Sequence, residues 1–361
     1  MAITGDSSTT RFRILTDVLL GPADPGQLRE AALGLHALLS EIAGISDSVP
    51  TASDEAQTIL PNGRAISPLD AARCVCDVPR TRAFALGLSA ALVQARKRFR
   101  GETLEVLYAG CGPFAALATL VAGRFPPEAV RFTLLDVHQR SLDAATRVFQ
   151  ALGLEASLAE CVLADAAEYV PSRLPHVILV ETMQRALEHE PQVAIAMNLA
   201  PRLRAGGLLV PERITVDAGL LDPAREFSLT PEELAAVASG GSPGRVRIIL
   251  GRLLELTAAS ARDLRVMPGS GTPDGAPRLP PVRIAMPSDA EPGLELALFT
   301  RVDVFGAIGL GDYESGLTYP AAAQVEPGVP RNGVEFSYRL GSRPGFEGHW
   351  EDLRDPPRPT G

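Results

Sequence analysis

The sequence predicts an α/β protein built around a parallel β-sheet, and two observations lead to this prediction. Between residues 101 and 212, short apolar runs alternate with helix-forming stretches, which is typical of a parallel sheet with right-handed crossovers. The first run, residues 104–109, leads into a turn at Gly110 and Gly112 and then into a helix rich in Ala and Leu. Since glycine lacks Cβ, the backbone can bend sharply there and lie close to a ligand at the helix N-terminus.

The length of 361 residues predicts more than one domain. We expect an N-terminal helical segment over residues 1–100, the parallel-sheet domain over 101–212 and a β-rich domain over 213–361. In the first segment, residues 1–10 are polar and predict a frayed end, apolar residues recur at helical spacing over 25–43, and Ser67-Pro68 begins a further helix. Another helix is expected over 81–99, whereas residues 46–64 are rich in Ser, Pro, Asp and Gly and predict a loop.

Three successive apolar runs of the parallel-sheet domain each end in a carboxylate. Residues 130–135 are followed by Asp136, residues 159–164 by Asp165, and residues 175–180 by Glu181. The carboxyl ends of parallel strands meet at one edge of an open sheet, and ligands bind at that edge. A fifth strand is expected after the paired glycines at 206 and 207.

The sequence pattern changes after residue 213, where alternating strand and helix signals give way to mainly strand-forming stretches. Strand-forming residues at 215–221, 294–308 and 333–340 predict an antiparallel sheet or barrel. Residues 245–264 predict a helix, and Thr230 is expected to cap a short one. Residues 268–281 are rich in Pro and Gly and predict an exposed loop.

Composition excludes several classes of protein. The formal net charge of −9 argues against a general nucleic-acid binder, which needs clustered Lys and Arg. No apolar run approaches the roughly 20 residues of a bilayer-spanning helix, and the first residues lack the features of a signal peptide. The four cysteines, at 74, 76, 111 and 161, form no metal-binding pattern. We therefore expect a cytoplasmic protein with reduced thiols, no metal and no membrane partner.

Residues 104 to about 212 resemble a class I S-adenosylmethionine-dependent methyltransferase, with its Rossmann-like sheet. The resemblance implies S-adenosyl-L-methionine as the cofactor, with Gly110 and Gly112 beside its methionine part. It also implies that Asp136 binds the ribose, and that Asp165 and Ala166 lie near the adenine. The sequence departs from the family at Tyr108, where an acid is usual, and at Ala115, the third small position. Because Ala115 also breaks the G-x-G-x-x-G pattern, a nicotinamide cofactor is disfavoured.

Three further motifs resemble protein arginine methyltransferases. Glu181, Met183 and Glu190 have the spacing of that family's double-glutamate loop, and residues 206–213 are similar to the strand that leads to its barrel. Residues 80–84, Arg-Thr-x-x-Phe, are similar to its cofactor-binding helix. The resemblance implies that Glu181 and Glu190 are the catalytic, acceptor-binding pair. Two carboxylates can hold a planar guanidinium by paired hydrogen bonds, and Arg80 can hold the cofactor carboxylate in the same way.

The departures from that family leave alternatives open. Residues 57–70 contain no aromatic residue, residues 225–281 have no counterpart, and the family's Thr-His-Trp loop has no clear match. Gly348-His349-Trp350 resembles that loop in sequence, but it lies close to the C-terminus, and we expect Trp350 to be a packed terminal aromatic residue. Methylation of a guanidinium or amine in a peptide or small molecule, small-molecule or natural-product O- or N-methylation, and a non-catalytic cofactor-binding subunit all fit the sequence. Tyr108 favours the last of these. The acceptor and the oligomeric state, including a homodimer, also stay open.

Overall fold

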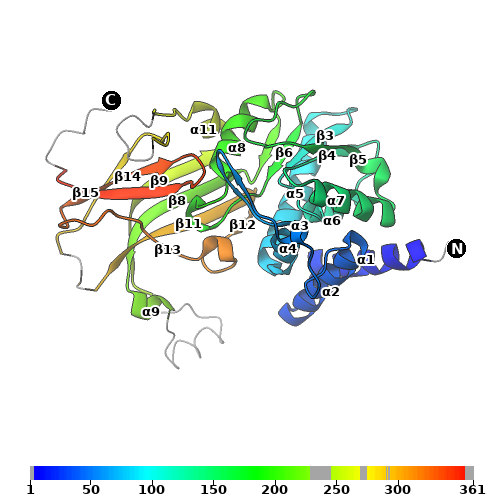
Figure 1. Cartoon of the computed structure of the whole chain (residues 1–361), viewed down its shortest axis with the longest axis horizontal. Coiled ribbons are helices and arrows are strands. Elements are labelled where there is room, and N and C mark those ends of the chain that lie inside the picture. Colours follow the sequence, from blue (N-terminus) through cyan, green and yellow to red (C-terminus); the bar gives the residue numbers. More distant parts are fainter. Residues whose placement is uncertain (1–3, 228–244, 269–274, 290, 292, 354–361) are drawn as a thin grey trace.

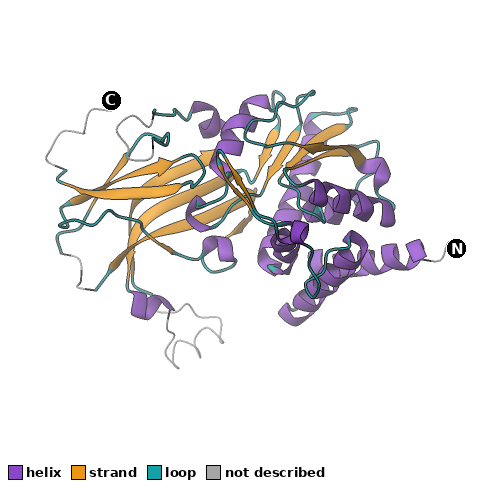
Figure 2. Cartoon of the chain, in the orientation of Figure 1, coloured by secondary structure: helices purple, strands orange, loops and turns teal. Residues whose placement is uncertain are grey.

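The computed structural model describes residues 4–227, 245–268, 275–289, 291 and 293–353 (Figure 1). N-terminal helices lie at one end of the molecule, the parallel sheet with its helices lies next to them, and antiparallel strands make up the other end. Most strands belong to one of two groups, the parallel sheet and the antiparallel strands at the other end of the molecule (Figure 2).

The parallel sheet has the strand order β5-β4-β3-β6-β7. Its strands are β3 (Leu104–Ala109), β4 (Val130–Asp136), β5 (Leu158–Leu163), β6 (Val177–Val180) and β7 (Leu208–Val210). The helices α5 (Val78–Arg98), α6 (Ala116–Ala122), α7 (Gln139–Ala151) and α8 (Gln192–Leu199) accompany it. All four residues of β6 are buried, as expected for a strand covered on both faces. The predicted Rossmann-like α/β fold is confirmed, and β3 is the central strand at which the strand order changes direction.

The N-terminal segment is helical, as predicted, but it begins earlier than expected. Its helices are α1 (Thr4–Leu20), α2 (Pro25–Ala43), α3 (Ala52–Glu55) and α4 (Pro68–Arg73). Ser67 caps α4 as predicted, because its hydroxyl accepts a hydrogen bond from the Asp70 amide. The prediction of a frayed end over residues 1–10 is wrong from Thr4 onward. Phe12 and Leu19, farther along α1, are buried in the core, and this packing stabilises a helix whose first turns are polar.

The segment 46–64, predicted as a loop, contains a β-hairpin in addition to α3. Its strands are β1 (Thr58–Leu60) and β2 (Gly63–Ala65), and they pair antiparallel with Leu60 opposite Gly63. The chain turns at Pro61-Asn62, directly before Gly63, and this run of Pro, Asn and Gly is a turn signal that does not enter the sequence-based prediction. Gly63 has φ +150°, and a Cβ there would lie 2.8 Å from the Pro191 nitrogen, so the hairpin tip packs tightly against residue 191.

The C-terminal region consists of two antiparallel sheets with short helices. One sheet contains β8 (Arg213–Leu221), β9 (Arg247–Thr257), β11 (Glu295–Phe305), β12 (Ile308–Leu310) and β13 (Ala321–Ala322). The other contains β10 (Val282–Ala285), β14 (Gly333–Arg339) and β15 (Gly345–Glu351), and the helices are α9 (Pro223–Phe227) and α11 (Ala258–Asp263). The strands predicted at 215–221, 294–308 and 333–340 are confirmed as parts of β8, β11 and β14.

The helix predicted over residues 245–264 is wrong for most of its length. Residues 247–257 form β9, which pairs with β8 from Arg213 opposite Thr257 to Leu221 opposite Arg247. Ile248 and Ile249 favour a strand, and the long pairing with β8 outweighs the helical spacing of the leucines. Only α11 is helical. The short helix predicted from Thr230 lies outside the described residues, as do residues 269–274 of the loop predicted over 268–281.

The glycine turn after β3 provides a test of this packing. Gly110 has φ +68°, and a Cβ there would lie 2.3 Å from Thr182 Cγ2, whereas Gly153 has the same φ with open space around it. We predict that Gly153→Ala lowers the free energy of unfolding by roughly 1–2 kcal/mol, the cost of a left-handed backbone. Gly110→Ala should cost roughly 3 kcal/mol or more, because a steric clash adds to that cost. Urea unfolding measures both, and equal losses would contradict the close approach of Thr182.

Candidate functional site

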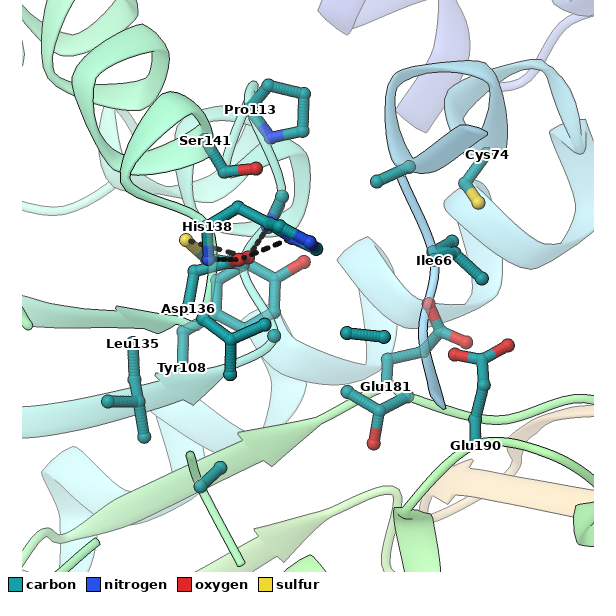
Figure 3. A pocket seen from close by; sticks show the side chains of 18 of the residues that line it. Ile66, Cys74, Tyr108, Pro113, Leu135, Asp136, His138, Ser141, Glu181 and Glu190 are labelled. Carbon is teal, nitrogen blue, oxygen red and sulfur yellow. Dashed lines mark hydrogen bonds and ion pairs between the residues drawn. The ribbon is translucent and has the colours of Figure 1, made fainter. Parts of the chain in front are cut away.

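A pocket lies at the carboxyl end of the parallel sheet (Figure 3). It is lined by every site residue that the sequence predicts: Arg80, Gly110, Gly112, Asp136, Asp165, Ala166, Glu181 and Glu190. Asp136 lies on one side of it, and Glu181 and Glu190 lie on the other. The convergence follows from the topology, because β4, β5 and β6 run parallel and end at one edge.

Asp136 organises the backbone of the glycine turn. Its Oδ2 accepts a hydrogen bond from the Gly112 amide at 2.9 Å, and its Oδ1 accepts one from the His138 amide at 2.9 Å. The side chain is only 8% exposed, and that exposure faces the pocket. The other two contacts of the carboxylate are long, 3.4 Å from Oδ1 to His138 Nδ1 and 4.0 Å from Cys111 Sγ to Oδ2. A ligand diol could replace these two contacts, because a carboxylate has about four lone-pair positions.

The end of β5 contributes a carboxylate oxygen without a partner. Asp165 Oδ1 accepts a hydrogen bond from the Ala167 amide at 2.8 Å, whereas Oδ2 is buried and has no hydrogen-bond partner among the described residues. The neighbouring Ala166 is buried, and its carbonyl accepts a hydrogen bond from the Asn198 side chain. A buried acceptor without a partner costs free energy, so Asp165 Oδ2 is suited to an N–H or O–H group of a ligand.

Arg80 and Glu181 form a buried ion pair in the pocket. Arg80 lies in the first turn of α5, where its amide donates to the capping carboxylate of Asp77, and its guanidinium donates to Glu181 Oε2. Burial raises the pKa of Glu181, although the Arg80 charge opposes this shift. Glu181 Oε1 is buried without a partner among the described residues. A role of Arg80 in holding a cofactor carboxylate stays a prediction, since here the guanidinium pairs with Glu181.

Glu190 is a buried carboxyl group close to this ion pair. Burial, and then the Glu181 charge, raise the pKa of Glu190 to about 7, while Arg80, Gln184 and Arg64 act to lower it. The group therefore changes its charge near neutral pH. Such a carboxyl can take up or release a proton under physiological conditions, which an ordinary glutamate does far less readily.

The loop between β6 and α8 has an unusual backbone. Its non-glycine residues with positive φ are Ala186, Leu187 and His189. Three residues of the C-terminal region hold this backbone: Thr300 Oγ1 accepts from the Ala186 amide at 2.7 Å, Tyr338 Oη donates to the Leu187 carbonyl at 2.7 Å, and the Pro344 carbonyl accepts from the His189 amide at 2.9 Å. The strained conformation presents Glu190 to the pocket.

Tyr108 lines the pocket at the position where the family resemblance implies an acid. Its ring is buried, and burial raises the pKa of the phenol well above its ordinary value, with the Glu181 charge adding to the shift. Tyr108 is therefore a neutral group whose hydroxyl can donate a hydrogen bond to a ligand or accept one from it, but which cannot neutralise a cation.

The β1–β2 hairpin contributes pocket residues that no motif in the sequence predicts. Leu60, Arg64 and Ala65 line the pocket from this hairpin. The Thr58 hydroxyl lies 3.0 Å from Nε2 of His138, the residue that also bonds Asp136. The turn signal at residues 61–63 could have located the hairpin, but no local signal indicates that it lies over the pocket.

His349 and Trp350 lie on β15, away from the residues that line the pocket. Trp350 is partly buried against the hydrophobic core, and His349 Nε2 lies 3.6 Å from Glu335 Oε1. Within the described ranges, no group of His, Cys, Asp and Glu side chains has the arrangement of a metal site. None of the helices described there has both the length and the apolar character needed to cross a membrane.

No family model matches the chain, and no curated protein is a significant match. Among solved structures, the chain is similar to a PRMT1 enzyme–prozyme heterotetrameric complex with AdoHcy from Trypanosoma brucei (12% identity, 73% of this chain and 84% of that chain, TM-score 0.44). It is also similar to protein arginine methyltransferase 10 of Arabidopsis thaliana (11%, 72% and 84%, 0.45). A third similar structure is a SAM-dependent methyltransferase from Thiobacillus denitrificans in complex with S-adenosyl-L-homocysteine (21%, 44% and 55%, 0.27).

Tyr338 tests whether the C-terminal region holds the loop. Tyr338→Phe leaves the Leu187 carbonyl buried without its donor, so we predict a loss of about 1–3 kcal/mol in the free energy of unfolding. Hydrogen exchange of the amides at 186–189 should also accelerate. Tyr319→Phe is the control, because Tyr319 is 44% exposed, and it should stay within about 0.5 kcal/mol of the wild type. Unchanged exchange in Tyr338→Phe would show that the loop holds its conformation without this bond.

Proposed function

We propose that the chain is an S-adenosylmethionine-dependent methyltransferase with a nitrogen acceptor, a guanidinium or an amine. The observation that carries this proposal is the convergence of Asp136, Asp165 and Glu181, each at the end of a parallel strand, in one pocket behind the glycine turn. Two of these carboxylates, Asp165 and Glu181, each have a buried oxygen without a partner among the described residues. Such oxygens are suited to the N–H and O–H groups of a nucleoside and of an acceptor.

The residues on the glycine side fit S-adenosylmethionine. Asp136 would accept from the ribose diol, and Asp165 with Ala166 would lie beside the adenine. Gly110 and Gly112 have positive φ, which glycine adopts readily, and because they lack Cβ atoms the methionine part could lie close to their backbone. Tyr108 would give the methionine amino group a hydroxyl partner in place of a carboxylate. When bound, the cofactor supplies a methyl group on a positively charged sulfur.

The residues on the other side fit a nitrogen acceptor. Glu181 keeps one oxygen on Arg80 and leaves the other for an acceptor N–H. Glu190 would orient the acceptor and take the proton that the attacking nitrogen loses. Alignment of the nitrogen lone pair with the methyl group can contribute roughly 7–11 kcal/mol of the barrier reduction. The pKa of Glu190, about 7, supports a reacting role over that of a non-catalytic binding subunit.

The cofactor assignment is tested at Asp136. Asp136→Ala should weaken the binding of S-adenosylhomocysteine by about 1.5–3 kcal/mol, since hydrogen bonds to a charged group are lost. Asp143→Ala is the matched control, because Asp143 is an exposed acid on the neighbouring helix α7 and does not line the pocket. Isothermal calorimetry measures both affinities. Equal affinity in the two variants would remove the ribose assignment, and no binding by the wild type would reject the proposed function.

The role of Glu190 predicts a pH dependence. A base must be ionised to accept a proton, and Glu190, with a pKa of about 7, is mostly protonated below that pH. We therefore expect kcat/KM to rise with pH through about 7 and to level off above it. Glu190→Gln should lower the rate strongly and abolish this inflection, with S-adenosylhomocysteine affinity nearly intact. Glu188→Gln is the control, because Glu188 lies two residues away and does not line the pocket. This variant should keep the wild-type rate and the inflection. A Glu190→Gln variant with the same inflection would assign the titration to another group.

A further inference from the structure

The β1–β2 hairpin lines the pocket and forms hydrogen bonds with residues on both sides of it. Near its base, the Thr58 hydroxyl contacts His138, which lies on the Asp136 side. Near its tip, the Arg64 amide donates to the His189 carbonyl at 2.8 Å, which lies on the Glu190 side. Figure 1 shows the hairpin extending from the N-terminal helices toward α8. Leu60, Arg64 and Ala65 of the hairpin line the same pocket as Glu181 and Glu190.

Arg64 brings a positive charge from this hairpin into the pocket. Its side chain is half-buried, and Nε is fully buried with no hydrogen-bond partner. In the part of the chain that the structure describes, the Arg64 side chain forms neither a hydrogen bond nor an ion pair. Arg80, the other arginine of the pocket, already pairs with Glu181. The pocket thus contains one guanidinium that is paired and one that is not.

The position of Arg64 indicates which ligand would meet it. Gly63, the neighbour of Arg64, packs against the backbone at residues 190 and 191, where a Cβ on Gly63 would lie 3.1 Å from the Glu190 carbonyl carbon. Arg64 and Glu190 both line the pocket, and Glu190 is an acceptor-side residue in the proposed function. A planar guanidinium with free donors binds carboxylates by paired hydrogen bonds. An acceptor in contact with both residues would carry an amino or guanidinium group toward Glu190 and an anionic group toward Arg64.

We infer that the methyl acceptor is a free amino acid, whose carboxylate is bound by Arg64 while its nitrogen faces Glu181 and Glu190. This inference rests on the proposed function and specifies its substrate class. A residue inside a protein chain has no carboxylate at its own α-carbon, so Arg64 discriminates against it. Arg64 acts here as a specificity residue, and the reaction itself is unchanged. The nitrogen lone pair would form the bond to the methyl group as the bond from that methyl group to the cofactor sulfur breaks and leaves its electron pair on sulfur, and the nitrogen's proton would pass to Glu190.

The test compares amino acids with amines that lack only the carboxylate. The probes are L-arginine with agmatine, L-ornithine with putrescine, and L-lysine with cadaverine, each titrated into the full chain saturated with S-adenosylhomocysteine. In at least one pair, the amino acid should bind roughly tenfold more tightly or better, the scale of hydrogen bonds to a charged group. Arg64→Gln should abolish this preference and leave the affinity for S-adenosylhomocysteine unchanged. Arg185→Gln removes an exposed arginine of the adjacent loop and should keep the preference.

Three results would overturn the inference. Equal binding within every pair would show that no carboxylate is recognised. Loss of S-adenosylhomocysteine affinity in Arg64→Gln would assign Arg64 to the cofactor carboxylate. Binding of S-adenosylhomocysteine without binding of any probe would exclude this class of acceptor. A wild-type chain that binds no S-adenosylhomocysteine would instead reject the proposed function itself, so the two failures are distinguishable.

Discussion

The buried ion pair between Arg80 and Glu181 is the interaction around which the pocket is built. It joins the first turn of α5 to the end of β6, two segments 101 residues apart in the sequence. Removing two charges from water is costly, and the cost is recovered only when both groups are held in good geometry. The N-cap of α5 holds Arg80, and the fully buried strand β6 holds Glu181. The pair therefore fixes the helical segment against the sheet edge and leaves one oxygen of Glu181 for a ligand.

The remaining charges of the pocket follow from this pair. Burial, and then the Glu181 charge, raise the pKa of the nearby Glu190 to about 7, although the charges of Arg80 and Arg64 oppose this shift. A ligand with a positive charge next to Glu190 would favour its ionised form. The pocket thus contains a carboxyl group that takes up or loses a proton near neutral pH, and a cationic ligand would lower the pKa of that group. Arg64 adds a positive charge to the pocket, and its buried Nε has no hydrogen-bond partner among the described residues.

Local sequence signals were sufficient for the parallel sheet and for much of the pocket. Each strand is a short apolar run, and parallel strands necessarily bring Asp136, Asp165 and Glu181 to one edge. The same signals did not predict the elements whose conformation or position depends on contacts between residues distant in sequence. Residues 247–257 form a strand because β8 pairs with them along its whole length, and the β-branched Ile248 and Ile249 do not by themselves reveal that pairing. Residues 58–65 carry a turn signal, but their place over the pocket depends on His138 and His189, distant in sequence. The ion pair of Arg80 with Glu181 was missed for the same reason, since each residue was assigned to a ligand separately.

The C-terminal sheets affect the pocket without lining it. Among the described residues, the lining ends at Ile195, yet Thr300, Tyr338 and Pro344 bond the loop that presents Glu190. Three residues of that loop have positive φ, a conformation that a free segment would leave. The position of Glu190 is therefore set by strands more than 100 residues later in the sequence. By contrast, the Asp136 carboxylate accepts hydrogen bonds from the Gly112 and His138 amides, both within the parallel-sheet region. The C-terminal sheets therefore support the Glu190 side of the pocket, whereas the β1–β2 hairpin contacts both sides through His138 and His189.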